Sequence, residues 1–172
     1  MLRIADLRLR GTTGVMAVRV RWPGSAGGDS SAPLMVFLPD AKPGGGVDTA
    51  DDALCHELCR RAGMVVLCAP WAIEREGAPA PALDRAALAL DWCADHASEL
   101  GADPERLTLA GRGAGAAAAF ALAQRARESG WPQIERQLLI VSERPSGDCA
   151  EKLRAAGAEV LTEDELAREG LP

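Results

Sequence analysis

The stretch LTLAGRGAGAAAAF, residues 107–120, decides the fold of this chain. It begins as a short apolar run typical of a buried strand, turns through a glycine-rich corner, and continues as an alanine-rich segment that favours a helix. Such a strand-to-helix corner has two familiar uses: it presents a nucleophilic serine, or it places a pyrophosphate at the start of the helix. Here the centre of the corner is Gly113, which has no side chain with which to attack a substrate.

The remaining sequence predicts strands and helices in alternation around this corner. Residues 3–10 and 15–22 alternate in polarity and predict an antiparallel hairpin. Apolar runs predict strands at 34–38, 64–69, 106–110 and 137–141, with a weaker one at 158–161. Helical spacing predicts helices at 49–62, 82–100 and 148–156, and a further helix from the glycine-rich corner to about residue 129. This order predicts a single α/β domain over residues 1–172, a three-layer α/β/α sandwich whose mostly parallel sheet starts with the antiparallel hairpin.

Composition excludes several classes of function. The net charge of −6 over 172 residues argues against a nucleic-acid partner, because little basic surface is available to neutralise phosphates. The apolar runs are short and the N-terminus has no signal-peptide pattern, so we expect a cytoplasmic protein with no membrane partner. Five cysteines, an odd number without C-x-x-C spacing, are expected to be small buried hydrophobic residues rather than disulfides.

Two longer stretches point to a known family. APALDRAALALDWCADHASELGADPERLTLAGRGAGAAAAFALAQRARESG (80–130) resembles the middle of bacterial esterases of the hormone-sensitive-lipase (acetyl-hydrolase) type, and DTADDALCHELCRRAGMVVLCAPW (48–71) resembles their preceding helix and strand. The likeness covers about residues 3–141. It implies a truncated α/β-hydrolase fold without a lid domain.

The resemblance also shows which catalytic parts are altered. The family carries a Gly-Asp-Ser-Ala-Gly elbow, whereas this sequence has Gly111, Arg112, Gly113, Ala114 and Gly115 at those positions. The flanking glycines are kept and the serine is replaced by Gly113. A glycine also relieves the backbone strain of the elbow, on the order of 1–3 kcal/mol. We expect a vestigial elbow that cannot carry out acyl transfer by serine.

The loop that would bind the oxyanion is altered as well. The family has His-Gly-Gly-Gly after its third strand, and here Pro39, Asp40 and Ala41 follow residues 34–38. Proline lacks an N–H, and a carboxylate opposes a developing oxyanion. An alternative register, with residues 43–46 as the loop, requires an insertion and restores no histidine.

The resemblance implies that the other members of the triad are missing. The acid would fall near Glu143 or Arg144, and no histidine follows His96. EKLRAAGAEV (151–160) resembles a later helix and strand of the family, which implies that a strand and the lid-bearing segment before it are deleted.

The histidines and cysteines have simpler explanations than a catalytic or metal site. His56 and His96 are expected to be ordinary helix residues, and Cys55, His56 and Cys59 do not form a metal site because His56 points about 100° away from Cys55 on a helix. Cys68 lies near the end of a strand but has no paired base. We therefore predict no metal and no cofactor.

A dinucleotide site is the alternative explanation of the corner. The glycines precede a helix, and Glu143 after the next strand could bind a ribose, but Ala116 stands where the third glycine is needed. The esterase resemblance explains the same glycines and much more of the chain.

The functional prediction is an esterase-like protein that has lost catalysis. It would bind a small acyl or aromatic ligand, with Asp40, Trp71, Gly113 and Glu143 as candidate contacts, or have a structural or regulatory role in a homo-oligomer or complex. A sheet edge exposed by the deletion would form that contact. The alternative is a weak carboxylester hydrolase in which Asp40 or Glu143 activates water.

Overall fold

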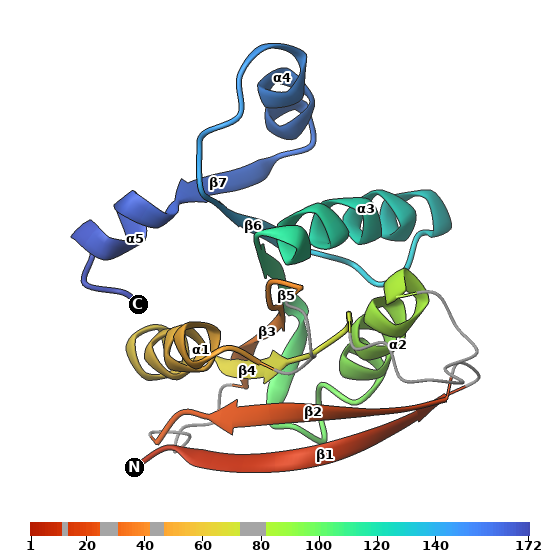
Figure 1. Ribbon diagram of the computed structural model, residues 1–172. Coiled ribbons are helices and arrows are strands. Elements are labelled where there is room, and N and C mark those ends of the chain that lie inside the picture. The colour runs from red at the N-terminus through yellow and green to blue at the C-terminus, as the bar shows by residue number, and fades with distance from the viewer. Residues whose placement is uncertain (12–13, 25–30, 42–46, 73–81) are drawn as a thin grey trace.

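The structure is a computed structural model that describes residues 1–11, 14–24, 31–41, 47–72 and 82–172. Strands and helices alternate along most of the chain (Figure 1). The elements are β1 (Arg3–Gly11), β2 (Gly14–Trp22), β3 (Ala32–Leu38), α1 (Thr49–Ala62), β4 (Val65–Cys68), α2 (Ala82–Asp95), β5 (Ala102–Arg112), α3 (Ala114–Ser129), β6 (Arg136–Val141), α4 (Gly147–Ala155), β7 (Ala158–Thr162) and α5 (Glu163–Arg168).

The strands form one sheet in the order β1-β2-β4-β3-β5-β6-β7. The β1–β2 and β2–β4 pairs are antiparallel, and every other pair is parallel. The chain passes from β3 to β4 on one side and then to β5 on the other side of β3. The carboxyl ends of β3 and β5 therefore meet at a topological switch point, where open α/β sheets bind ligands.

Helices cover both faces of this sheet. On one face, α2 and α3 pack against Leu9, Val18, Val36 and Leu109 in the larger core cluster. On the other face, α1 and α5 pack against residues such as Phe37 in a second cluster. The predicted three-layer sandwich with a mostly parallel sheet and an N-terminal hairpin is therefore confirmed.

Two details of the sequence prediction are wrong. The helix predicted over 82–100 ends at Asp95, and a run of turns continues to Gly101, whose φ of 71° suits a residue without a side chain. The cysteines are buried at positions 55, 59, 68 and 93, but Cys149 is exposed on α4, a helix with no buried residue.

Within the described residues, the structure contains no helix with both the length and the apolar character needed to cross a membrane.

Candidate functional site

Strand register brings the two altered loops together. Leu38, the last residue of β3, pairs with Gly111 near the end of β5. Residues 39–41 (the β3 loop) and residues 111–115 (the elbow) therefore leave neighbouring parallel strands at the same edge of the sheet. The sequence predicted both segments separately, and the register makes them one site.

The elbow keeps the backbone shape of a nucleophile turn. Gly113 has φ 56° and ψ −122°, and its N–H donates to the carbonyl of Ile140 on β6 at 3.0 Å. A positive φ of this kind disfavours residues with a side chain.

The two flanking glycines allow the strand and the helix to approach closely. A Cβ added to Gly115 would lie 2.6 Å from the carbonyl oxygen of Pro39, and one added to Gly111 would lie 2.7 Å from the backbone nitrogen of Ala116. Because both contacts are with backbone atoms, neither neighbour can move aside. We call Gly111 and Gly115 the glycine frame.

Asp40 fills the centre of the elbow. Its Oδ1 accepts a hydrogen bond from the N–H of Ala114, the first residue of α3, at 2.8 Å. A Cβ added to Gly113 would lie 2.6 Å from the Cγ of Asp40. The carboxylate therefore occupies the space into which a side chain at position 113 would project, and it uses the amide that follows the nucleophile position.

Electrostatics favour this placement of Asp40. A carboxylate at the N-terminus of a helix is stabilised by the helix dipole and by the free N–H groups of the first turn. The same charge opposes binding of a second anion at that point, whether an oxyanion or a pyrophosphate. The dinucleotide interpretation of the glycines is disfavoured for this reason.

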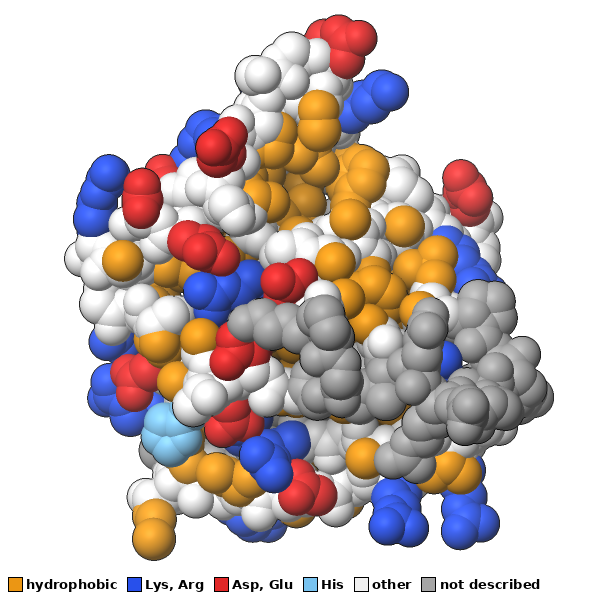
Figure 2. All heavy atoms as spheres, in the orientation of Figure 1, with side chains coloured by type: hydrophobic (Ala, Val, Ile, Leu, Met, Phe, Trp, Pro, Cys, Tyr) orange, Lys and Arg blue, Asp and Glu red, His pale blue; other side chains and the backbone are white. Residues whose placement is uncertain are grey.

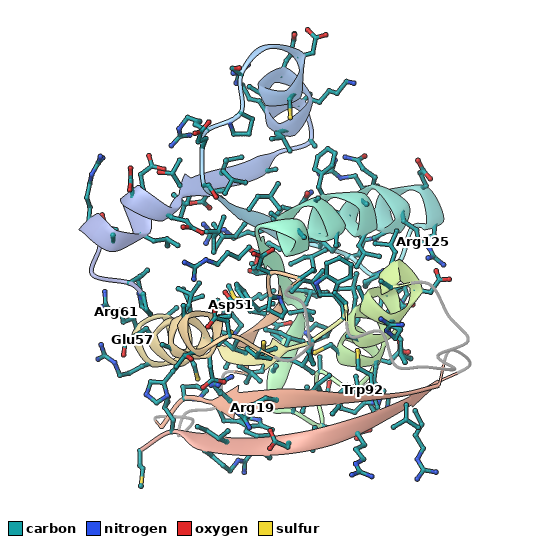
Figure 3. The ribbon with its side chains drawn as sticks, in the orientation of Figure 1. Arg19, Asp51, Glu57, Arg61, Trp92 and Arg125 are labelled. Carbon is teal, nitrogen blue, oxygen red and sulfur yellow. The ribbon has the colours of Figure 1, made fainter. Side chains whose placement is uncertain are left out.

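A second acid, Asp51, is hydrogen-bonded to the backbone of the β3 loop. It lies in the first turn of α1 (Figure 3), its side chain is 2% exposed, and its Oδ2 accepts the N–H of Asp40 at 3.1 Å. Arg112 forms ion pairs with Asp51 at 3.4 Å and with Glu163 at 3.2 Å. Burial raises the pKa of Asp51, while the Asp40 N–H and Arg112 partly oppose that increase.

Sequence reasoning missed Asp51 and Glu163. Arg112 occupies the position where the resembled family has an acid, so a reversed charge at the elbow was a signal that acidic partners lay nearby. It could not identify them, because Asp51 is 61 residues and Glu163 51 residues away along the chain.

Of the two remaining predicted ligand contacts, Trp71 lies beside the β3 loop and Glu143 is not connected with it. Trp71 is half-buried, and its Nε1 donates to the carbonyl of Pro39 at 3.0 Å, which places the indole against the β3 loop. Glu143 is exposed just beyond β6. Among the described residues, no hydrogen bond or ion pair connects it with Asp40 or Trp71. The structure thus brings Asp40, Trp71 and Gly113 together, and Glu143 stays a separate prediction.

The alternative register of the oxyanion loop, residues 43–46, lies outside the described residues.

In the described part of the chain, no three His, Cys, Asp or Glu side chains are grouped so as to hold a metal. Cys55 and Cys59 are fully buried, and burial raises the pKa of the Cys59 thiol to about 11. His96 stacks on Trp92 with ring centroids 4.4 Å apart.

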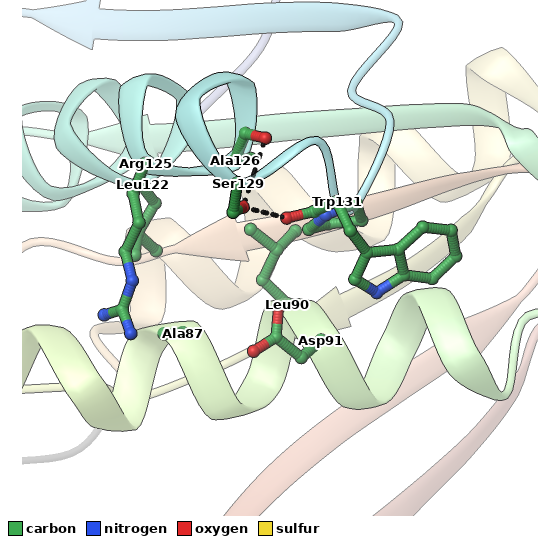
Figure 4. A pocket seen from close by; sticks show the side chains of 9 residues that line it. Ala87, Leu90, Asp91, Leu122, Arg125, Ala126, Ser129 and Trp131 are labelled. Carbon is green, nitrogen blue, oxygen red and sulfur yellow. Dashed lines mark hydrogen bonds between the residues drawn. The ribbon is translucent and has the colours of Figure 1, made fainter.

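Three hollows in the described part of the chain lie away from the elbow, and one of about 460 Å³ lies along β1 and β2 beside Leu7, Arg8 and Arg19. The other two are smaller. One, of about 260 Å³, is between α2 and α3 and is lined by Leu90, Asp91 and Trp131 among others (Figure 4). The other, of about 190 Å³, is lined by Leu153 and Val160 of α4 and β7, where apolar side chains gather on the face shown in Figure 2. None of the three includes a residue of the elbow or of the β3 loop.

Comparisons with known proteins agree with this architecture. Residues 43–168 match a family model described as the alpha/beta hydrolase fold. Esterase LipI of Mycobacterium tuberculosis is 32% identical over 142 residues, which cover 80% of this chain and 43% of the relative. Carboxylesterase NlhH of the same species is 33% identical over 124 residues, covering 71% of this chain and 38% of the relative. The chain thus spans less than half the length of these two esterases.

Solved structures show the same similarity. The hyperthermophilic esterase from Pyrobaculum calidifontis superposes with a TM-score of 0.68 at 26% identity, covering 98% of this chain and 55% of that one. Esterase LipW from Mycobacterium marinum gives a TM-score of 0.65 at 30% identity, covering 87% of this chain and 48% of that one. The resemblance noted in the sequence is confirmed, and the chain belongs to the α/β-hydrolase-fold family, among its carboxylesterase-like members.

Proposed function

We propose that this chain is an esterase-like protein that does not hydrolyse esters. It acts by binding a small acyl or aromatic ligand beside the elbow, or by a structural or regulatory role in an oligomer or complex. A cytoplasmic location, expected from the sequence, is part of the proposal.

One observation carries the proposal: the Asp40 carboxylate fills the elbow at Gly113 and accepts the N–H of Ala114. Acyl transfer in this fold needs an attacking oxygen at the elbow and amide donors free to stabilise an oxyanion. Gly113 provides no oxygen, and the amide that would stabilise the oxyanion already binds a carboxylate.

Hydrolysis of short-chain p-nitrophenyl esters by purified protein tests the proposal. We expect the rate to equal that of buffer, and to stay there in an Asp40→Ala variant. Turnover that disappears in Asp40→Ala or in Glu143→Ala would support the alternative, a weak carboxylester hydrolase that uses a carboxylate to activate water. Turnover that survives both changes indicates a contaminating esterase. The same turnover in the purified Asp40→Ala/Glu143→Ala double variant would confirm the contamination.

A thermal-shift screen tests the binding role. Butyrate and benzoate represent the acyl and aromatic ligands, and acyl-CoA, NAD and FAD represent the alternatives. Stabilisation by butyrate or benzoate that is lost in Trp71→Ala would support a ligand site beside the β3 loop. Stabilisation by NAD alone would favour the dinucleotide interpretation and contradict the proposal.

A further inference from the structure

The two ends of the sheet differ in how open their edges are. β7 is five residues long, and two of its backbone groups already have side-chain partners. The carbonyl of Val160 accepts from Arg144 at 3.4 Å, and the N–H of Thr162 donates to Glu165 at 2.8 Å. An edge occupied in this way is protected against pairing with another strand. The C-terminal edge on which the sequence prediction relied is therefore the less available of the two.

β1 is the longer edge. It spans nine residues and pairs with β2 in a continuous register from Arg3 to Gly11, and among the described strands none lies on its other side in the sheet (Figure 1). Alternate residues of an edge strand turn their N–H and C=O groups away from the sheet. Ile4 and Val15, on β1 and β2, are 47% and 58% exposed. Such an edge is a template for another strand.

The charges along β1 are complementary to a second copy of β1 in one register. In a two-fold antiparallel pair centred on Leu7, Asp6 faces Arg8 of the second copy, and Arg8 faces Asp6 of the second copy. All four side chains are exposed. Opposite charges directly across an antiparallel pair are stabilising.

Neighbouring symmetric registers are disfavoured. Centring the pair on Asp6 places two aspartates opposite each other, and centring it on Arg8 places two arginines opposite each other; like charges in that position are destabilising. A shift of one residue would pair exposed with buried positions, so the buried face of one sheet, which includes Leu9, would lie on the same side as the exposed face of the other. The register centred on Leu7 avoids both problems.

A neighbouring residue strengthens the same arrangement. Arg19 on β2 binds Asp6 from within the chain at 2.8 Å. In the paired form each Asp6 would lie between Arg19 of its own chain and Arg8 of the second copy, so its charge would be shared by two guanidinium groups. From the length, register and charges of this edge, we propose that the chain forms a two-fold dimer through β1, which joins two sheets into one. This inference rests on the part of the proposed function that places the chain in an oligomer, and it names a second copy of the chain as the partner.

Charge reversal tests the dimer. Light scattering after size exclusion, over the micromolar range, should show a concentration-dependent dimer for the unmodified chain. Arg8→Asp and Asp6→Arg each place like charges opposite each other, and each should weaken the dimer by about tenfold or more. An equimolar mixture of the two variants restores opposite charges at every position, so it should form a heterodimer. Glu159→Arg on β7 is the matched control and should leave the dimer intact.

Circular dichroism of each variant separates lost pairing from lost folding, and the mixture provides a second check because misfolded chains would not recover. A chain that is monomeric at all concentrations would overturn the inference. So would a mixture that stays monomeric, or a dimer broken by Glu159→Arg and not by Arg8→Asp. Ester hydrolysis bears only on the proposed loss of catalysis, so failure of one proposal is distinguishable from failure of the other.

Discussion

The glycine frame and the centre of the elbow are adjacent, but a side chain added at each would meet a different kind of atom. Gly111 and Gly115 contact backbone atoms that cannot move, whereas Gly113 faces a carboxylate at the end of a movable side chain. The frame is a requirement of packing between β5, α3 and the β3 loop, and it is independent of any reaction. The centre, Gly113, is where the resembled family carries its serine, and here Asp40 fills the space. The shape of the elbow therefore does not require a nucleophile at its centre.

The largest effect is expected from breaking the frame. Gly115→Ala forces a Cβ against the carbonyls of Leu38 and Pro39, and we expect it to lower the free energy of unfolding by about 3 kcal/mol. Urea unfolding measures the change. The matched control is Gly63→Ala, because Gly63 has φ 63° but no atom near its added Cβ. It should cost only about 1 kcal/mol. Gly115 itself has no positive φ. A loss no larger than the one at Gly63 would therefore show that close packing does not require the frame.

A smaller loss is expected at the centre. Gly113→Ala combines an unfavourable φ with a collision against Asp40, and we expect it to cost about 2 kcal/mol. Because the collision is with a side chain, a double variant with Asp40→Ala should lose less than the sum of the two single variants. Additive losses would mean that the carboxylate does not fill the elbow.

Asp40→Ala alone should have a weaker effect. It removes the acceptor of the Ala114 N–H and a negative charge at the start of α3, which together contribute about 1 kcal/mol. Asp40→Asn keeps an acceptor at the same position and should lose about half as much. Thermal unfolding can compare the two. An Asn variant as unstable as the Ala variant would contradict the hydrogen bond between positions 40 and 114.

The smallest expected effect is a pH dependence at Asp51. Burial raises its pKa in the folded state above the usual 3.8, so ionisation is more costly in the folded than in the unfolded chain. As pH rises from 3.8 through the folded-state pKa, the unmodified chain should lose stability relative to Asp51→Asn, which does not ionise. The exposed Asp164→Asn is the control. A stability difference between Asp51→Asn and the unmodified chain that stays constant, or that moves the other way with pH, would contradict this account.

Much of the fold could be predicted from sequence because local patterns determined it. Apolar runs and glycine stops located the strands and helices, and the alternation of the hairpin indicated its antiparallel pairing. The end of α2 was misplaced, because the segment 96–100 has helical spacing but forms turns.

The candidate site was predicted less fully, for a physical reason. The glycine at position 113, where the resembled family has a serine, and the presence of Asp40 were visible as single residues. Their contact depends on strand register, which pairs Leu38 with Gly111, and no local pattern reports it. The same holds for Asp51 beneath the β3 loop, whose partners lie far away in the sequence.

The most direct test of the central claim is the first turnover with p-nitrophenyl butyrate, followed by stopped-flow absorbance at protein concentrations high enough to see one equivalent of product. A nucleophile at the elbow would release a burst of p-nitrophenolate equal to the protein concentration, even if later steps were slow. Because Gly113 offers no attacking atom and Asp40 occupies its place, we predict no burst and a trace identical to that of buffer. A stoichiometric burst that disappears in Asp40→Ala would contradict the account.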